Sequence, residues 1–308
     1  METEAREIVS KIDFEKIKDH PNILIAARFW DDDRYRAAKT CYKFMRMIDD
    51  MIDDRKADEA TINCIEKQLF IDRVNSYIEC LKSMGSDDPF VEELVTTLNT
   101  FKIPLKLFHT FASSMIHDIN YDGFSTFEEF LQYSEGASVS PASVFVHLCC
   151  LGRINGSYTE PTYDIVEIAR PCAIFSYIVH IIRDFQKDQH ANLNYFPKDI
   201  LEKHNLLPAD LKNIASGGTI PGSFREMISE YIDHAEGYRV QTLEQIRRMT
   251  PLLEARYLLS LHIIYNLYLQ VFERIDYKTG SFTTSELNPG PDEVNERVLK
   301  VIDEFYSS

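Results

Sequence analysis

Hydrophobic residues recur every three or four positions along most of this chain, and short polar breaks containing Gly or Pro separate these segments. This spacing is typical of amphipathic helices, and we find no segment with the alternation of a β-strand. The predicted helices cover about residues 22–30, 32–57, 61–83, 88–99, 102–117, 126–135, 140–152, 161–189, 208–214, 222–247, 250–276 and 292–306. We therefore expect an all-α protein, with one large helical domain over residues 1–276 and a C-terminal loop and amphipathic helix over residues 277–308.

The composition agrees with a helical protein and narrows the choice of partners. Only 11 Gly and 12 Pro occur in 308 residues, whereas turn-rich all-β folds need more of both. The chain has 49 acidic and 33 basic residues, which gives a formal net charge of −16. Because nucleic acids and anionic lipids bind through basic surfaces, we expect no nucleic-acid partner, and any polyanion that binds must do so through a metal ion.

We find neither a signal peptide nor a membrane-spanning segment in the sequence. The N-terminal residues mix acidic and basic side chains and contain no apolar core of a signal peptide. The longest uncharged stretch, Tyr257–Phe272, has 16 residues and contains several polar side chains, whereas a membrane span needs about 20. The six cysteines form no CxxC pair. We therefore expect a cytoplasmic protein with reduced thiols.

The helix predicted over residues 32–57 ends in a run of acidic residues. Its apolar stripe, which would face a core, consists of Tyr35, Ala38, Tyr42, Met45, Ile48 and Ile52. Asp49 and Asp53 stand four residues apart on the same side, with Asp50 and Asp54 beside them. Taken alone, the run is most simply a solvated helix end. Its partners would then be Arg46, Arg55 and Lys56.

A second helix ends in the same way and changes that interpretation. Residues 174–183 are almost wholly apolar and are followed by Asp184 and Asp188, again four residues apart. Burying these carboxylates without partners would be very unfavourable. Two helices with inward carboxylates, each with a nearby Arg, suggest facing walls of a pocket inside a helical bundle.

Magnesium is the cation that such a pocket suits. Mg²⁺ prefers oxygen ligands, keeps several waters, and binds where one or two carboxylates meet the phosphate oxygens of a substrate. A diphosphate could then bind to this acidic protein, and the guanidinium groups of Arg46 and Arg183 could donate hydrogen bonds to its oxygens.

Both aspartate motifs resemble those of the squalene/phytoene synthase family. The first is Met45-Arg46-Met47-Ile48-Asp49-Asp50-Met51-Ile52-Asp53-Asp54, preceded by Tyr42. The second is Ile181-Ile182-Arg183-Asp184-Phe185-Gln186-Lys187-Asp188-Gln189, followed by Tyr195-Phe196-Pro197-Lys198-Asp199. Weaker similarities occur at Asp118, Tyr133, Leu207–Leu211, Tyr238 and Arg256. The resemblance covers roughly residues 20–275, which is most of the chain.

The resemblance implies a single large helical bundle of the isoprenoid synthase type, with a central active-site cavity. It implies a prenyl transferase that uses Mg²⁺, or Mn²⁺ in its place, to condense two allylic prenyl diphosphates head to head and to release diphosphate. We expect the C15 substrate, farnesyl diphosphate, in preference to the C20 substrate. Because the hydrocarbon product of such a reaction is insoluble in water, peripheral contact with a membrane is expected for its release.

The family also implies roles for individual residues. The expected metal ligands are Asp49, Asp50, Asp53, Asp184 and Asp188. The expected substrate-binding residues are Arg46, Arg183, His20, Asn22, His180 and Arg256. The expected catalytic residues, which would guide the carbocation or the loss of a proton, are Tyr42, Tyr195 and Tyr238.

Several departures from the family pattern leave the product open, including His20 and Asn22 in place of a Ser pair and residues 134–143 in place of a Tyr-rich segment. His180 stands where the family usually has an amide, Lys187 stands where it has Glu, and Ala191–Asn194 replaces a basic run. The last difference weakens the expectation of a second diphosphate or of NADPH. A terpene synthase that acts on one prenyl diphosphate is therefore the alternative enzyme. A non-catalytic lipid-binding relative is a third hypothesis, which the retained aspartates disfavour.

One further motif competes for a metal. Residues Asp118–Glu129 fit the EF-hand expression at every required position. However, Ser125 occupies the position where an apolar residue is common, and Ser125 and Thr126 with Glu128 and Glu129 also form a helix capping box. We therefore expect a helix start here and not a calcium site.

Overall fold

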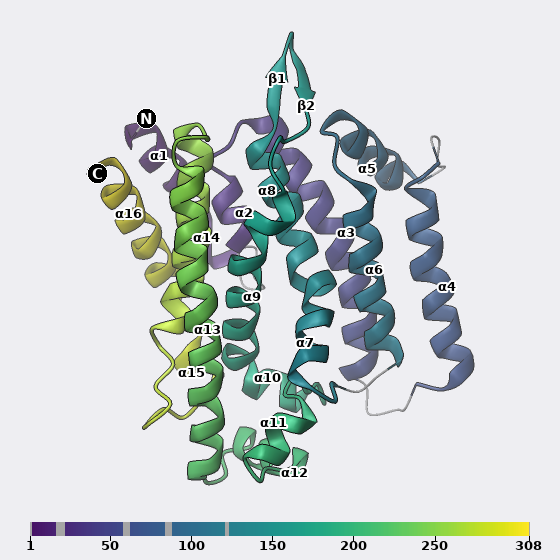
Figure 1. The fold of residues 1–308 in the computed structure, drawn as a ribbon, viewed down its shortest axis with the longest axis vertical. Helices are drawn as coiled ribbons and strands as arrows, with labels where there is room; N and C mark the ends of the chain where they lie inside the picture. The colour runs from purple at the N-terminus through teal and green to yellow at the C-terminus, as the bar shows by residue number, and fades with distance from the viewer. Residues whose placement is uncertain (1, 17–21, 58–61, 84–87, 121–122, 308) are drawn as a thin grey trace.

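The computed structural model describes residues 2–16, 22–57, 62–83, 88–120 and 123–307, and it confirms the all-α prediction. Long helices run side by side along the molecule (Figure 1). In chain order the elements are α1 Glu2–Val9, η1 Phe14–Lys16, α2 Asn22–Ala27, α3 Asp32–Ala57, α4 Cys64–Cys80, α5 Pro89–Thr100, α6 Leu105–Asn120, α7 Phe127–Ser134, η2 Glu135–Val139, α8 Ser140–Cys150, β1 Gly152–Ile154, β2 Ser157–Thr159, α9 Ile165–Arg183, α10 Phe185–His190, α11 Lys198–Lys203, α12 Pro208–Ala215, α13 Gly222–Met249, α14 Ala255–Phe272, α15 Thr284–Leu287 and α16 Pro291–Ser307.

Helix α9 lies in the core of the bundle. It packs against α8, α13, α14 and η2, and Ile178, Val179 and Ile182 are completely buried. Its length and its mean hydropathy of 1.6 would allow it to cross a membrane, but 67% of this apolar stretch is buried inside the protein. Helix α9 is therefore a core helix that the other helices cover.

The helix predicted over 161–189 is divided in two. The backbone turns at Asp184 (φ −91°, ψ 4°), which ends α9 and immediately precedes α10. The apolar pattern continues across this point, because Ile182 and Phe185 on either side are both buried. The break therefore interrupts the helix at Asp184 without exposing the core.

The expectation that the chain contains no strand was wrong at one place. Strands β1 and β2 form an antiparallel hairpin in which Gly152 pairs with Thr159 and Ile154 with Ser157. Asn155 (φ 51°) and Gly156 (φ 82°) form its two-residue turn, and this dipeptide favours such positive φ values. The short helices α1, α11 and α15 were also not predicted.

Helices α7 and α8 are joined by a π-helical turn, η2, where a break in the helix was expected. Gly136 lets this turn approach α6 closely, since a Cβ atom at this position would lie 2.2 Å from the Ser114 hydroxyl and 2.3 Å from the Thr110 carbonyl oxygen. Ser114 Oγ also donates a hydrogen bond of 2.8 Å to the Tyr133 carbonyl. The turn thus fixes the end of α7, including Tyr133, against α6.

The C-terminal segment packs onto the bundle. Helix α16, predicted over 292–306, contacts α14, α1 and η1. Val298, Val301 and Ile302 of α16 are buried in the same hydrophobic core as the residues of α9. The final helix therefore shares the core of the large helical domain.

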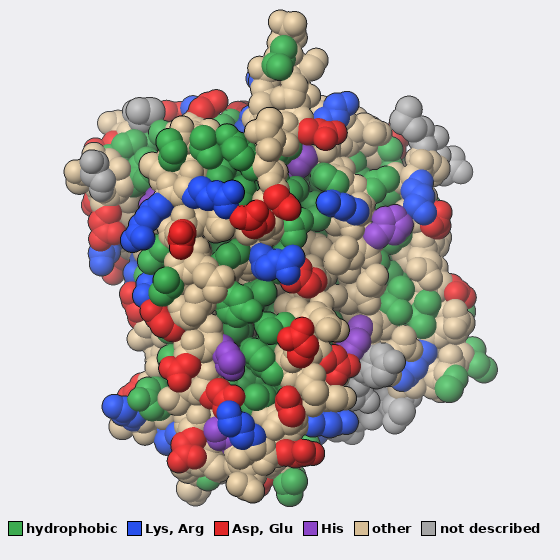
Figure 2. Space-filling model, viewed as in Figure 1, with side chains coloured by type: hydrophobic (Ala, Val, Ile, Leu, Met, Phe, Trp, Pro, Cys, Tyr) green, Lys and Arg blue, Asp and Glu red, His purple; other side chains and the backbone are tan. Residues whose placement is uncertain are grey.

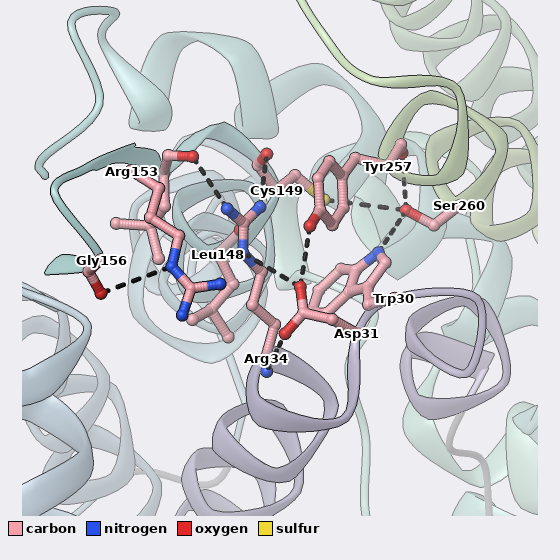
Figure 3. A network of polar contacts seen from close by, with 10 residues as sticks. Trp30, Asp31, Arg34, Leu148, Cys149, Arg153, Gly156, Tyr257 and Ser260 are labelled. Carbon is pink, nitrogen blue, oxygen red and sulfur yellow. Dashed lines mark hydrogen bonds and ion pairs between the residues drawn. The ribbon is translucent and has the colours of Figure 1, made fainter. Parts of the chain in front are cut away.

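A buried arginine fixes the start of α3 (Figure 3). The Arg34 guanidinium is 4% exposed and donates hydrogen bonds to the carbonyl oxygens of Leu148 (3.0 Å) and Leu151 (2.9 Å) at the end of α8. It lies over the Tyr257 ring, 4.2 Å from its centroid, and the Tyr257 hydroxyl donates to Asp31 at 2.8 Å. These contacts join α3, α8 and α14 at the hairpin end of the molecule, because the C-terminal carbonyls of a helix attract a cation.

Candidate active site

The first acidic motif lies in the second half of α3. Ile48 and Ile52 are buried in the core, so the neighbouring Asp49 and Asp53 lie at the edge of the inward face. Burial and the nearby Asp53 raise the pKa of Asp49 to about 8, and burial also raises the pKa of Asp53. A protein site that holds carboxylates together in this way favours either protons or a cation between them.

Arg46 lies one turn before these aspartates. Its Nη1 is 2.8 Å from Asp49 Oδ2, and its Nη2 forms an ion pair with Asp50. Tyr42 lies one further turn back, where burial raises its pKa to about 12 and where it interacts with Arg46 and Tyr268. The residues that the sequence groups into the first motif are therefore close together.

The second motif begins with a buried ion pair at the end of α9. Arg183, which is 2% exposed, donates from Nε to Asp184 Oδ1 (2.7 Å) and from Nη2 to Asp184 Oδ2 (2.9 Å). The His180 Nε2 lies 2.8 Å from the same Oδ2. Burial acts to raise the pKa of Asp184, but His180 and Arg183 hold it well below its usual range. Asp184 is thus ionised and strongly held.

Asp188 connects the two motifs. It lies on α10, where burial, Asp184 and Asp53 together raise its pKa to about 8. The interaction with Asp53 means that α3 and α10 bring carboxylates of both motifs into one electrostatic cluster. Asp53 and Asp188 thus lie near enough to interact, and the pocket between the two i, i+4 pairs stays a prediction.

A polar and aromatic layer lies beside this cluster. The Tyr133 hydroxyl on α7 donates a hydrogen bond of 2.5 Å to Asp118 on α6, and the Lys56 ammonium lies 3.9 Å from the other oxygen of Asp118. Burial raises the pKa of Asp118 to about 7 even though Lys56 and Tyr133 oppose the shift. The Tyr177 ring is 6.2 Å from that of Tyr133 and 6.3 Å from that of Tyr195.

Other predicted residues lie in different places. Asn22 hydrogen-bonds Tyr268, which interacts with Arg183 and Asp184, so it borders the second motif. Tyr238 interacts with Glu128, Glu135 and Arg170, and the structure does not bring it to the aspartates. Arg256 is 42% exposed and lies 3.9 Å from Glu4 near the chain termini. His20 lies outside the described residues.

Two tyrosines in the cluster were not predicted from the sequence. Tyr177 interacts with Asp118, Asp49 and Asp53, and Tyr268 interacts with Arg183 and Asp184. Tyr177 precedes Asp184 by seven residues, which is two helical turns, so its side chain shares the face of that aspartate. This spacing from Asp184 could have identified Tyr177 from the sequence. Tyr268 stands in an apolar helix that has no such acidic residue to mark its face.

The donor set fits magnesium bound together with a diphosphate. Among the residues that the structure describes, no group of three or more His, Cys, Asp or Glu side chains is arranged to hold a metal ion alone. Magnesium needs only one or two protein carboxylates when phosphate oxygens and waters complete its shell. Asp49, Asp53 and Asp188 are oxygen donors, and Asp53 contributes to the raised pKa of both Asp49 and Asp188, so a divalent cation would relieve this repulsion.

The EF-hand-like segment is arranged as a helix start. Thr126 caps α7 by accepting a hydrogen bond from the Glu129 backbone (3.1 Å), and the Glu129 carboxylate accepts one from the Ser125 backbone (2.6 Å). Asp118, the first position of the motif, faces Tyr133 and Lys56 in the interior. Tyr121 and Asp122 of this segment lie outside the described residues. The capping interpretation from the sequence is confirmed.

A surface groove of about 540 Å³ lies away from the aspartates, between α3 and α5. Arg36, Thr40, Glu93 and Phe101 are among its lining residues, and Thr40 Oγ1 donates to Glu93 at 2.9 Å. The central cavity expected beside the aspartates stays a prediction. On the face shown in Figure 2, acidic and basic side chains are interspersed.

Comparison with known proteins gives a family match. The sequence profile described as squalene/phytoene synthase matches residues 18–288. A search of curated proteins by sequence found no significant match.

Solved structures share the fold. A crystal structure of a dehydrosqualene synthase in complex with ligand has 16% sequence identity and a TM-score of 0.68, over 99% of this chain and 97% of that one. Squalene synthase HpnC from Alicyclobacillus acidocaldarius has 15% identity and a TM-score of 0.62, over 85% and 90% of the two chains. YisP from Bacillus subtilis subsp. subtilis strain 168 has 13% identity and a TM-score of 0.58, over 96% of both chains. The isoprenoid synthase fold expected from the motifs is therefore confirmed.

Proposed function

Since this chain belongs to the squalene/phytoene synthase family and is a prenyl transferase, we propose that it condenses two allylic prenyl diphosphates head to head and releases diphosphate in a Mg²⁺-dependent reaction. We propose farnesyl diphosphate, the C15 compound, as the preferred substrate over its C20 homologue.

One observation carries this proposal. Asp53 on α3 and Asp188 on α10 come from motifs far apart in the sequence and still interact with each other. An acidic helix end that served only solubility would have no reason to face a second one in the protein interior. A shared site for an anionic substrate and divalent cations explains why the chain retains both.

The chain's own donors would hold the diphosphate. Arg46 and Arg183 lie beside the two motifs and carry planar groups that match phosphate oxygens. Mg²⁺, when bound by Asp49, Asp53, Asp184 and Asp188, supplies positive charge to the departing diphosphate. Asn22, through Tyr268, would help to orient the Arg183 side of the site.

The aromatic layer would contact the hydrocarbon chain of the substrate. Tyr42, Tyr177 and Tyr195 are aromatic and lie next to the carboxylate cluster. Aromatic faces attract cations, so these rings would stabilise the allylic cation and exclude water while the second substrate's double bond attacks. We propose that the water-insoluble product leaves the protein at a membrane surface.

The test is incubation of the purified protein with C10, C15 or C20 diphosphates and Mg²⁺, with measurement of diphosphate release and of the products. A C30 product from the C15 substrate is expected. Products with the carbon number of a single substrate would instead identify a terpene synthase. If no substrate gave metal-dependent release, both enzyme hypotheses would fail and the lipid-binding hypothesis would remain.

A pair of variants tests the aspartate assignment. Asp53→Ala is expected to lower the rate of diphosphate release at least about 100-fold, because it removes a ligand that stabilises the leaving group. Asp233→Ala changes an exposed aspartate on α13 and is expected to leave the rate unchanged. Circular dichroism should show that both variants fold. An unchanged rate in Asp53→Ala would refute the assignment.

A further inference from the structure

The second motif contains a nitrogen donor that the first motif lacks. His180, Asp184 and Asp188 are spaced four residues apart, and His180 Nε2 lies 2.8 Å from Asp184 Oδ2. The His180 side chain is 37% exposed whereas that of Asp184 is 6% exposed. The imidazole therefore lies on the accessible side of a buried, ionised carboxylate.

The separation of these two atoms suits neighbouring ligands of one metal ion. Two donors at about 2.1 Å from an octahedral metal, at right angles to each other, are about 3 Å apart. A metal ion could thus take the place of the proton that the imidazole and the carboxylate share. Arg183 contacts both oxygens of Asp184, so it fixes the carboxylate while His180 approaches Oδ2.

The chemistry of this pair differs from that of an all-carboxylate site. Imidazole nitrogen binds first-row transition ions better than it binds Mg²⁺, and affinity increases from Mn²⁺ through Fe²⁺ to Co²⁺. Magnesium prefers oxygen ligands and loses its waters reluctantly. Because no described group supplies three such protein ligands, oxygens of a diphosphate and waters would fill the remaining positions.

We propose that His180 and Asp184 together bind a divalent first-row transition ion, for which Mn²⁺ is the probe, along with the diphosphate of the substrate. The proposal rests on the proposed function, and it gives His180 the role of a metal ligand in place of a substrate contact. The protein is then expected to bind Mn²⁺ more tightly than Mg²⁺, by about tenfold or more.

Pulsed electron paramagnetic resonance of Mn²⁺ tests this directly. The purified protein is mixed with Mn²⁺ and inorganic pyrophosphate, and the ¹⁴N coupling of a bound imidazole is measured. The coupling is expected in the wild-type protein and in His109→Asn, which changes an exposed histidine on α6. It is expected to disappear in His180→Asn, which keeps an oxygen donor at the same position. Circular dichroism should show that both variants fold.

Competition titrations give a second measure. The ratio of Mg²⁺ to Mn²⁺ dissociation constants is expected to fall about tenfold in His180→Asn and to stay unchanged in His109→Asn. Bound Mn²⁺ without ¹⁴N coupling in the wild-type protein would overturn the proposal, as would coupling that persists in His180→Asn.

The outcome is separable from that of the proposed function. Turnover of prenyl diphosphates with Mg²⁺ in a protein that lacks the ¹⁴N coupling would leave the enzyme assignment in place and overturn the histidine ligand. Coupling without turnover of any substrate would support the ligand and refute the reaction.

Discussion

Replacing Asp188 by Asn is expected to stabilise the metal-free protein, although it removes a residue proposed for function. Burial, together with Asp184 and Asp53, raises the pKa of Asp188 from 3.8 to about 8. The unfolded chain therefore releases this proton at a much lower pH than the folded protein does. Above pH 4 the wild-type protein loses stability with each further rise in pH, until the folded carboxyl also ionises near pH 8.

The size of the effect follows from this difference in pKa. Each pH unit between the unfolded and folded values corresponds to about 1.4 kcal/mol, so complete burial would give roughly 6 kcal/mol above pH 8. The Asp188 side chain keeps some contact with water, which screens its charge. We therefore expect Asp188→Asn to raise the free energy of unfolding by about 2–3 kcal/mol at pH 8, and by less than about 1 kcal/mol at pH 5.

Urea unfolding followed by circular dichroism, in EDTA at pH 5 and pH 8, measures this difference. Asp233→Asn, at an exposed position of α13, is the matched control and is expected to change neither value by more than about 0.5 kcal/mol. Addition of Mg²⁺ and pyrophosphate should narrow the gap, because the wild-type carboxylate then has a cation partner. A variant that is less stable than the wild type at pH 8, or equally shifted at both pH values, would refute the reasoning.

Two further predictions concern the fold. Arg34→Met is expected to lower the free energy of unfolding by about 2–4 kcal/mol, since it leaves buried carbonyls at the end of α8 without a donor. Arg36→Met, at an exposed neighbouring position, should change this free energy little. Urea midpoints measure both variants, and equal effects would contradict the role of Arg34. Gly136→Ala is expected to destabilise the protein by more than about 2 kcal/mol, because its Cβ would meet Ser114 and Thr110. Gly237→Ala has no atom within 4 Å of its Cβ and is expected to stabilise α13 by about 0.5–1 kcal/mol. Thermal unfolding that shifted the midpoints of both variants in the same direction would argue against this packing.

The sequence predicted the long helices and the meeting of the two acidic motifs, because both depend on one regular spacing. The stripe that includes Ile48 and Ile52 determines which side of α3 is buried, and the aspartates next to it follow from the same geometry. The helix over 32–57 was predicted with the bounds that α3 has.

The parts that were missed depend on local backbone conformation or on contacts between distant segments. The break at Asp184 leaves no trace in the apolar pattern, since residues on both sides are buried. The hairpin has only three residues in each strand, although Asn155-Gly156 is a typical turn. Tyr238 matches the family in sequence position, but a position in the sequence does not say which face of α13 the side chain occupies. The Tyr238 side chain interacts with Glu128 and Glu135.

Because Arg34 anchors the start of α3, the length of this helix determines where its aspartates lie. Asp49 follows Arg34 by fifteen positions, a span of about 22 Å in a helix, and the guanidinium holds one end of that span to α8. Insertion of a single residue between them would rotate the carboxylates by about 100° away from α10. Apart from Tyr42 and Arg46, the identities of the intervening side chains can vary during evolution as long as they fill the core, but the number of residues between the two ends cannot.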